Sequence, residues 1–358
     1  MILSFVCPAA PSPLGGVNVL YEYANGLARR GHEVHIAHGE FWGRPGVASV
    51  DELTWFRFEP SVAHHFGSGA IPLPEADVIF GTGAPPQLGL PVLLIQGFEM
   101  FPKEFEREVF RTPCLKICVA SWLRTVGIEF GVPPQQIVHV PMGIDLDAFR
   151  VRTRLDARAF DVGMLYNAHP AKGFLPGLQA LEQVRAGLGG GMRVIIFGTG
   201  EPEIELPEWV TFRRDPDRRA LIDEIYNDCR VFVQPSHYEG FGLTAVEAMA
   251  CGCALVSTDN GGSRDYAIAG ETAVLAVAGD VDSLAAGVDR LLRDDGERTR
   301  LAMNGQTFVQ RFQWDRAVEE LEAHLARYIA APAEFLQPPH DDADRRTVAT
   351  YGSIGSLG

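Results

Sequence analysis

The segment VFVQPSHYEGFGLTAVEAMACGCALVST, residues 231–258, joins two apolar runs through a polar loop and a run of small residues. The runs VFVQPS and ALVST predict two strands, and LTAVEAMACG between them predicts a short helix that ends at Gly252. A strand, a helix and a second strand in this order are typical of a parallel α/β unit. The loop HYEGFG follows the first strand, and folds of this class bind ligands at the carboxyl ends of their strands.

The same alternation extends in both directions along the 358 residues. Two strand series of similar size predict two doubly wound, Rossmann-like domains with their strand ends around a central cleft. The expected domains are 1–145 and 146–312, followed by an amphipathic helix at 313–330 and a weakly ordered tail at 331–358. The first strand series is ILSFV, EVHIAH, DVIFGTG, VLLIQG, KICVAS and IVHVP, and the second is DVGMLY, RVIIFGTG, VTFRR, VFVQPS, ALVST and AVLAV. Helices are expected at 17–30, 103–111, 121–130, 173–187, 217–228, 243–251, 262–269, 281–293 and 314–330.

Composition limits the class of partner. The net charge of −15 argues against nucleic acid, which favours a basic surface. Six cysteines form no C-x-x-C pair, so they are expected to be free thiols in a reducing compartment. No positive region precedes the first apolar run, and no run approaches the roughly 20 apolar residues of a membrane span. These features predict a cytoplasmic protein with at most peripheral membrane contact.

Three strand-to-helix turns carry candidate ligand-binding residues. Gly15 and Gly16 follow the first strand and allow a ligand to approach the backbone, although a plain turn is the alternative. The spacing is not G-x-G-x-x-G, which disfavours a dinucleotide site. Lys172 stands at the mouth of a predicted helix, where the helix dipole disfavours a cation, so a bound phosphate is indicated.

The third turn holds Glu239 in its loop and Glu247 within the following helix. The backbone N–H groups of Phe241, Gly242 and Leu243 at the helix start suit a diphosphate. Small apolar neighbours surround Glu247, so its carboxylate needs a polar partner such as a ribose diol. In a fourth turn, Asp265 either faces the ligand or supports the first turn of the next helix, and the sequence leaves both open. The DLD triplet at 145–147 imitates a metal motif, but its place in a linker favours a structural role, and no metal ligands are predicted.

These segments together resemble the retaining nucleotide-sugar glycosyltransferases of the GT-B fold, specifically the large family four. The strongest likeness is PSHYEGFGLTAVEAMACGCALVSTDNGG, which resembles the E-x7-E signature of that family. Weaker likenesses are the Gly15-Gly16 opening, the linker VPMGIDLDAF, the PAKG turn and a final helix that in this fold crosses back to the first domain. The likeness covers most of residues 1–330.

The resemblance implies a role for each candidate residue. Glu239, with the backbone from Gly240 to Leu243, would meet the donor sugar and β-phosphate, and Glu247 would bind the ribose. Lys172 would hold the diphosphate, and Gly15 and Gly16 would lie beneath the donor phosphate and the acceptor. No cofactor is implied besides the nucleotide-sugar co-substrate.

The chain departs from the family pattern at positions that affect the donor. Asn167 stands where the family usually has an arginine, so the diphosphate would rest on Lys172 and helix N-termini. Gln96 replaces a histidine of the first-domain cleft, and Gln96, Gly97 and Glu99 are candidate sugar or acceptor contacts. The neutral amide of Gln96 suggests a deoxygenated sugar such as rhamnose.

The expected function is transfer of a hexose or deoxyhexose, with retention and without a metal ion, to a glycan, lipid-linked or small-molecule acceptor in polysaccharide biosynthesis. The alternatives are a non-catalytic nucleotide-sugar-binding protein and another GT-B enzyme such as a sugar-nucleotide epimerase.

Overall fold

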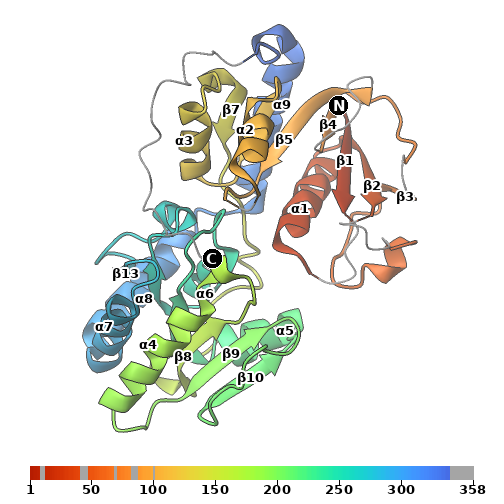
Figure 1. Cartoon of the computed structure of the whole chain (residues 1–358). Helices are drawn as coiled ribbons and strands as arrows, with labels where there is room; N and C mark the ends of the chain where they lie inside the picture. The colour runs from red at the N-terminus through yellow and green to blue at the C-terminus, as the bar shows by residue number, and fades with distance from the viewer. Residues whose placement is uncertain (9–12, 41–46, 68–70, 82–87, 100, 339–358) are drawn as a thin grey trace. The chain divides into compact units, whose positions relative to one another are not determined.

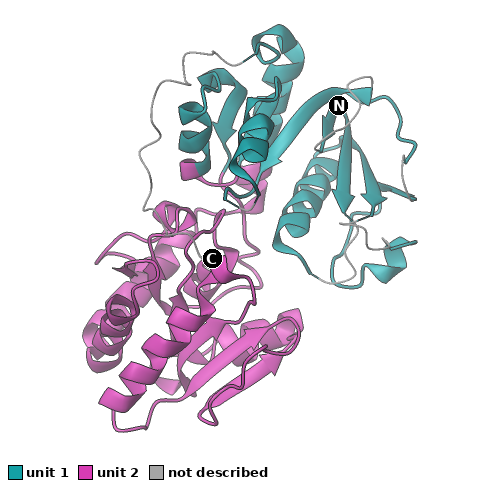
Figure 2. Ribbon diagram, in the orientation of Figure 1, with its two compact units in different colours: residues 1–118, 123–140, 321–358 teal, residues 119–122, 141–320 magenta. Residues whose placement is uncertain are grey.

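A computed structural model describes residues 1–8, 13–40, 47–67, 71–81, 88–99 and 101–338 (Figure 1). The chain divides into two compact units (Figure 2). Unit 1 comprises residues 1–118, 123–140 and 321–358, and unit 2 comprises residues 119–122 and 141–320. The expected domain limits at 145 and 312 stay predictions, because compact units defined by contacts need not coincide with domains that fold separately.

Unit 1 is built on a parallel sheet with the strand order β3-β2-β1-β4-β5-β6-β7. Its strands are β1 (Ile2–Pro8), β2 (Glu33–Gly39), β3 (Ala63–Phe66), β4 (Val78–Phe80), β5 (Leu90–Ile95), β6 (Leu115–Cys118) and β7 (Ile137–His139). Its helical segments include α1 (Gly15–Arg29), η1 (Val50–Glu52), α2 (Lys103–Arg111), α3 (Ser121–Glu129) and η3 (Pro134–Gln136). The first two residues of α3 belong to unit 2.

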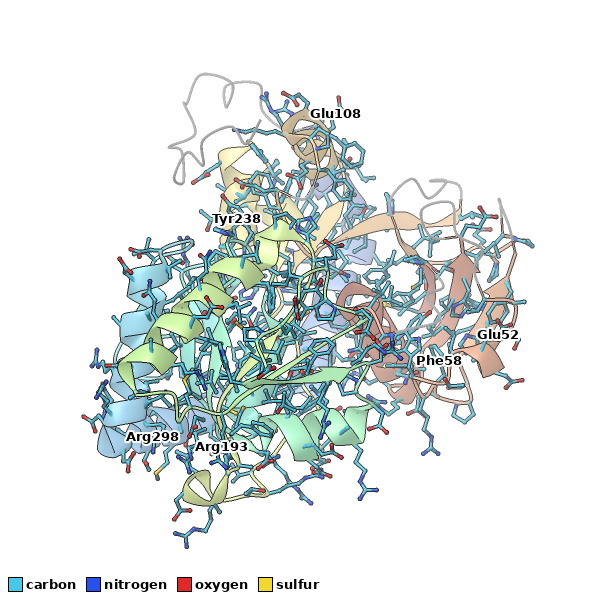
Figure 3. All side chains as sticks on the ribbon, turned by 60° about the horizontal axis from the view of Figure 1, so that its bottom comes forward. Glu52, Phe58, Glu108, Arg193, Tyr238 and Arg298 are labelled. Atoms are coloured by element: carbon cyan, nitrogen blue, oxygen red, sulfur yellow. The ribbon has the colours of Figure 1, made fainter. Side chains whose placement is uncertain are left out.

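The core of unit 1 includes a cluster of aromatic rings between α1 and the β2–β3 edge of the sheet. The Tyr21 ring lies 4.7 Å from that of Phe58, which Figure 3 labels, and the His38 ring stacks on Phe66 at 4.6 Å. Strand β3 was not predicted. Its sequence AHHF lacks β-branched residues, and it forms because its backbone pairs with β2 while Phe66 stacks on His38.

Unit 2 is built on a second parallel sheet with the strand order β10-β9-β8-β11-β12-β13. Its strands are β8 (Phe160–Leu165), β9 (Val194–Gly198), β10 (Val210–Arg214), β11 (Cys229–Gln234), β12 (Ala254–Thr258) and β13 (Ala273–Ala276). Its helical segments include η4 (Leu155–Ala157), η5 (Pro170–Lys172), α4 (Phe174–Gly187), α5 (Arg218–Ala220), η6 (Leu221–Tyr226), α6 (Leu243–Ala250), η7 (Gly262–Asp265), α7 (Val281–Arg293) and α8 (Asp295–Val309). Strands β9 and β12 are buried along their whole length, as expected for a parallel sheet covered on both faces.

Two predicted helices differ in the structure. The helix expected at 262–269 is only the 3₁₀ turn η7, because Thr272 Oγ1 accepts a hydrogen bond from Ile268 N and donates one to Tyr266 O, which holds the chain in a loop. The helix expected at 217–228 starts as α5 and continues as the π-helix η6. Helix α1 begins at Gly15, so both glycines lie in its first turn rather than before it.

The last helix, α9 (Trp314–Ala330), starts in unit 2 and ends in unit 1. Its carboxyl-terminal half is fixed in unit 1, where Glu322 pairs with Arg30 and His32, and Tyr328 donates a hydrogen bond to Pro91 O. After α9 the short turn η8 (Pro332–Glu334) precedes Phe335, which is buried against Tyr328. The expectation of a weakly ordered tail is therefore wrong for 331–338, and residues 339–358 lie outside the described part.

The prediction of an α/β fold with two parallel, doubly wound sheets is confirmed. Within the described residues, no helix is both long and apolar enough to cross a membrane.

Candidate functional site

The sheet of unit 2 reverses its strand order between β8 and β11. From β8 the chain adds β9 and β10 on one side, and it then returns to add β11, β12 and β13 on the other. The carboxyl ends of β8 and β11 therefore diverge into loops at a topological switch point, where open α/β sheets bind ligands. Lys172 follows β8 and Glu239 follows β11, so the topology brings the two predicted catalytic residues to one edge of the sheet.

Lys172 is positioned by the tight turn that leads into α4. Gly173 follows it with a φ of 62°, and a Cβ at this glycine would overlap the carbonyl oxygen of Pro235. His237 N donates to Ala171 O over 2.7 Å, which ties the loop after β11 to η5. A glycine is therefore needed at 173 for the loops that follow β8 and β11 to pack together.

Asn167 has a structural role in the same loop. Its Oδ1 accepts a hydrogen bond of 2.8 Å from His169 N, and His169 Nδ1 accepts one of 3.2 Å from Ala171 N. These two side chains cap successive turns that lead to Lys172. The structure thus shows how an amide at 167 shapes the loop.

The backbone of Glu239 is held by the loop after β12. Glu239 N donates to Asn260 O over 2.9 Å, and Gly262 N donates to Glu239 O over 3.2 Å. On the next residue, Gly240 O accepts a hydrogen bond of 2.9 Å from Trp122 Nε1. The loop that carries Glu239 is therefore fixed from both sides.

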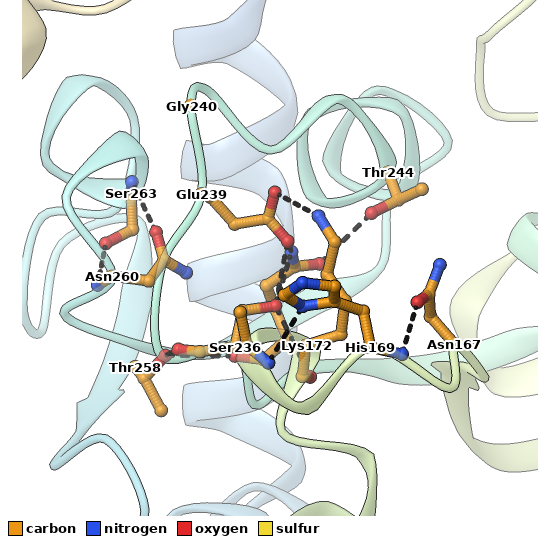
Figure 4. Close-up of polar contacts among 12 residues, drawn as sticks. Asn167, His169, Lys172, Ser236, Glu239, Gly240, Thr244, Thr258, Asn260 and Ser263 are labelled. Carbon is orange, nitrogen blue, oxygen red and sulfur yellow. Dashed lines mark hydrogen bonds and ion pairs between the residues drawn. The ribbon is translucent and has the colours of Figure 1, made fainter. Parts of the chain in front are cut away.

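Both oxygens of the Glu239 carboxylate accept hydrogen bonds from neighbouring side chains (Figure 4). Its Oε2 accepts a hydrogen bond from Lys172 Nζ at 2.8 Å, and the Glu239 side chain is 9% exposed against 32% for Lys172. Its Oε1 accepts from Gln234 Nε2 and from Ser236 Oγ, both at 2.8 Å. The structure thus joins the two predicted catalytic residues in an ion pair supported by two neutral donors.

Helix α6 begins directly after this pair. Gly242 precedes it with a φ of 101°, and a Cβ at this glycine would overlap the Tyr266 hydroxyl. Phe241 is buried against Tyr266 and Phe312. Leu243 and Thr244 start the helix, so their backbone N–H groups have no acceptor within it and are suited to an anion, whereas Ala245 N already donates to Gly242 O.

Glu247 lies one turn into α6 and accepts a hydrogen bond of 3.0 Å from the Tyr226 hydroxyl. Desolvation by its apolar surroundings raises the pKa of Glu247 from 4.5 to about 7, although the Tyr226 hydrogen bond and the nearby Arg218 oppose the shift. The side chain is partly exposed, so a ligand can reach it. Glu247 has a partner within the protein and is poised to change charge near neutral pH.

The remaining candidate residues lie in unit 1. Gln96 Nε2 donates to Gly16 O over 3.0 Å, and a Cβ at Gly16 would overlap the Gln96 amide. Gly15 is the first residue of α1, and Gly97 follows Gln96 after β5. Glu99 has a φ of 65°, and its N–H donates to the buried Glu106 carboxylate. The structure brings Gly16 and Gln96 together.

The structure gives defined partners to Asp265, whose role the sequence left open, and to Asp145 of the DLD triplet, for which the sequence favoured a structural role. Asp265 accepts hydrogen bonds from the backbone N–H and the hydroxyl of Ser121. Asp145 Oδ2 pairs with Arg218 at 2.6 Å, while its Oδ1 accepts from Asp147 N and Ala148 N. The DLD triplet therefore forms a capped turn. Among the described residues, no three His, Cys, Asp or Glu side chains are grouped to hold a metal ion.

Sequence reasoning missed three residues that contact the glutamates: Gln234, Ser236 and Tyr226. Gln234 and Ser236 stand in the strand-end segment QPS, where two polar residues after a buried apolar run were the available signal. Tyr226 ends η6, far from Glu247 in sequence, and only the structure reveals the hydrogen bond between them.

The comparisons with known proteins agree with this geometry. Residues 147–308 match the family model described as glycosyl transferases group 1. A D-inositol 3-phosphate glycosyltransferase of Xylanimonas cellulosilytica is 31% identical over 211 residues, which cover 52% of this chain and 50% of the relative. An MMP alpha-(1->4)-mannosyltransferase of Mycolicibacterium hassiacum is 31% identical over 251 residues, 66% of this chain and 59% of the relative. The chain thus spans about half the length of the curated relatives it matches.

Solved structures share the fold at low identity. A sucrose-phosphate synthase from Thermosynechococcus elongatus matches with a TM-score of 0.73 at 17% identity, over 92% of this chain and 100% of that one. Anabaena HepE in complex with UDP-glucose matches with a TM-score of 0.72 at 17% identity, over 91% and 100%. At such identities the likeness shows the fold alone. The chain therefore has the GT-B fold, and its residues 147–308 match the family model of glycosyl transferases group 1.

Proposed function

We propose that this protein is a retaining glycosyltransferase that moves a hexose or deoxyhexose from a nucleotide-diphosphate sugar to a glycan, lipid-linked or small-molecule acceptor. One observation carries the proposal: Lys172 and Glu239 meet at 2.8 Å at the switch point of the second sheet, beside the first turn of α6. A cation and a helix N-terminus suit a diphosphate, and a carboxylate next to them suits the hydroxyls of its sugar.

The donor would replace contacts that the protein now makes with itself. Lys172 would turn from Glu239 toward the diphosphate, whose charge would also be met by the N–H groups of the first turn of α6. Glu239 Oε2 would then be free to accept hydrogen bonds from the sugar. Glu247 would accept hydrogen bonds from the ribose diol, sharing its carboxylate with the Tyr226 hydroxyl.

The chemistry follows from the charges that develop. Breaking the anomeric bond builds positive charge on the sugar and negative charge on the leaving diphosphate, which Lys172 and the aligned N–H groups would stabilise. These groups belong to the protein, so we propose a metal-independent reaction. Front-face attack, with the leaving oxygen taking the acceptor proton, would retain the configuration without a protein base.

The sugar and the acceptor are proposed from unit 1. Gly15, Gly16, Gln96, Gly97 and Glu99 would contribute their contacts, and the Gln96 amide, held by Gly16, would suit a sugar without a distal hydroxyl, such as rhamnose. A glycan acceptor in polysaccharide biosynthesis is supported by a relative named capsular polysaccharide biosynthesis glycosyltransferase CapM, from Staphylococcus aureus, which is 29% identical over 146 residues. The six buried free cysteines support a reducing, cytoplasmic location.

A second candidate is a non-catalytic nucleotide-sugar-binding protein. It is favoured by Asn167, which replaces a cation that the family usually has and is engaged in capping His169. Its diphosphate would then be held by Lys172 and helix N-termini alone. The other alternative is another GT-B enzyme, such as a sugar-nucleotide epimerase. Such an enzyme would use the same donor site to isomerise the nucleotide sugar, without an acceptor.

Thermal-shift measurements with UDP-, GDP- and dTDP-sugars test the donor site. We expect at least one to raise the Tm of the protein and to do so much less for Lys172→Met, while the exposed-lysine control Lys103→Met behaves as wild type. A protein that none of these donors stabilises would contradict the proposal.

Product analysis with the stabilising donor then separates the candidates. A glycosylated acceptor whose anomeric configuration matches the donor, by NMR, supports a retaining transferase. An isomerised donor without acceptor indicates an epimerase, and binding without any product indicates the non-catalytic protein.

A further inference from the structure

The side chain of Gln234 links the Glu239 carboxylate to the first turn of α6. Gln234 is the last residue of β11 and is 2% exposed. Its Nε2 lies 2.8 Å from Glu239 Oε1, and its Oε1 lies 3.1 Å from Thr244 Oγ1, on the second residue of α6. Both contacts lie at the edge of the sheet that holds the Lys172–Glu239 pair.

The direction of these hydrogen bonds follows from the groups themselves. An ionised carboxylate only accepts, so the amide NH₂ of Gln234 must face Glu239. The amide oxygen then faces Thr244, and because this oxygen also only accepts, the Thr244 hydroxyl must donate to it. The hydrogen bonds thus run in one direction, from Thr244 through Gln234 to Glu239.

We propose that Gln234 is a positioning residue that holds the Glu239 carboxylate at a fixed distance from the phosphate-binding turn of α6. This inference rests on the proposed function. Gln234 and Ser236 both donate to Oε1, which leaves Oε2 to face Lys172. When a diphosphate draws Lys172 away, the two neutral donors keep the carboxylate in place, so that its Oε2 meets the sugar instead of following the lysine.

The link to Thr244 gives the arrangement its second function. The leaving diphosphate would rest on the first turn of α6, and Glu239 would contact the sugar on the other side of the breaking bond. A rigid connection between these two groups fixes the geometry in which the bond breaks, and a displacement of about 1 Å is enough to lower a rate about a hundredfold.

Gln234→Leu and Gln234→Glu test the proposal by steady-state transfer rates between about pH 6 and 8. We expect Gln234→Leu to lower kcat by about a hundredfold at every pH, with a smaller change in the donor KM. Gln234→Glu places a second carboxyl beside Glu239, and the two groups share a proton. Its protonated form donates to Glu239 as the amide did, so its kcat relative to wild type should fall as the pH rises.

Two further variants control the experiment. Gln310→Glu, on an exposed glutamine outside the site, should match wild type at every pH. Thr244→Val removes the hydroxyl that donates to Gln234 and leaves β11 unchanged. It should lower kcat in the same direction as Gln234→Leu, so it tests the proposal even if the Gln234 variants fail to fold.

The outcomes separate this inference from the function on which it rests. Wild-type rates in the Gln234 variants, or in Thr244→Val, overturn the positioning role while leaving the transferase intact. A fall of kcat in Gln234→Glu that is the same at every pH also overturns it, since a merely structural residue would give that result. A wild-type protein without transfer to any acceptor overturns the proposed function, and the positioning role with it.

Discussion

The hydroxyl groups of Tyr226 and Tyr266 are both buried in unit 2, but they differ in their surroundings. Tyr266 is 0% exposed, and its hydroxyl has no hydrogen-bond partner among the described residues. A buried hydroxyl without a partner costs free energy that a phenyl ring avoids. We expect Tyr266→Phe to raise the free energy of unfolding by about 1 kcal/mol, measured by urea denaturation.

Tyr226→Phe is the matched control, because the Tyr226 hydroxyl donates to Glu247. Its loss removes a hydrogen bond and should lower the free energy of unfolding by about 1 kcal/mol. Equal effects of the two substitutions would show that the Tyr266 hydroxyl has a partner in solution.

The pKa of Glu247 predicts a pH-dependent affinity for the donor. Its raised pKa of about 7 means that the stability it contributes is fully present below about pH 4.5 and is lost as the pH rises through 7. In the proposed donor site the ribose hydroxyls would donate to the ionised form of Glu247, so donor affinity should rise as the pH rises. We expect the Kd of a UDP-sugar to fall about tenfold from pH 6 to pH 8 by calorimetry. In Glu247→Gln this dependence should disappear, and a wild-type Kd that is constant over this range would contradict the role of Glu247.

At the scale of residues, the sequence located the loops better than the contacts. The place of Lys172 and Glu239 at one edge of the sheet was predictable, because each follows a strand whose carboxyl end borders the switch point. The ion pair between them could not, because it depends on side-chain directions across two loops. Gln234 was seen only as the end of a strand, since nothing local indicates that its amide turns to a loop carboxylate.

At the scale of elements, the turn that carries Lys172 depends on one glycine. Gly173→Ala would force a residue with a side chain into a φ of 62° and would push its Cβ into the Pro235 carbonyl. We expect the free energy of unfolding to fall by more than about 1 kcal/mol, and donor affinity to fall with it, because Lys172 moves. Urea denaturation and calorimetry with the donor measure the two effects.

Gly187→Ala is the control at the other end of α4. No atom lies within 4 Å of the position its Cβ would take, and it is the last residue of the helix. It should leave donor affinity unchanged and raise the free energy of unfolding by about 0.5 kcal/mol. A loss of affinity in both variants would locate the effect in α4 as a whole rather than in its first turn.

The elements that could not be predicted from the sequence are those whose conformation depends on contacts with other segments. Strand β3 exists through pairing with β2, and its sequence alone lacks a strand pattern. The segment after Gly262 looks helical, but the Thr272 hydroxyl holds its backbone in a loop. The central strands were predictable because burial on both faces requires long apolar runs.

At the scale of the whole molecule, α9 belongs to two cores. Ala317 and Val318 are buried in its first half, which lies in unit 2, and Leu325 and Tyr328 are buried in its second half, which lies in unit 1. The last segment of unit 1 therefore follows the whole of unit 2 in the sequence. Each unit nevertheless has its own sheet and its own buried apolar side chains. A substitution that creates a cavity in one unit should therefore lower the stability of that unit alone.

Leu325→Ala and Leu301→Ala test this separation. Both leucines are 0% exposed, Leu325 in the unit 1 half of α9 and Leu301 in the core of unit 2. Each substitution should lower the stability of its own unit by about 2–5 kcal/mol. Hydrogen exchange followed by mass spectrometry should then show lost protection in β1 and β5 for Leu325→Ala, and in β9 and β12 for Leu301→Ala. The same pattern of lost protection in both variants would show instead that the two units unfold as one cooperative structure, with α9 transmitting the loss between them.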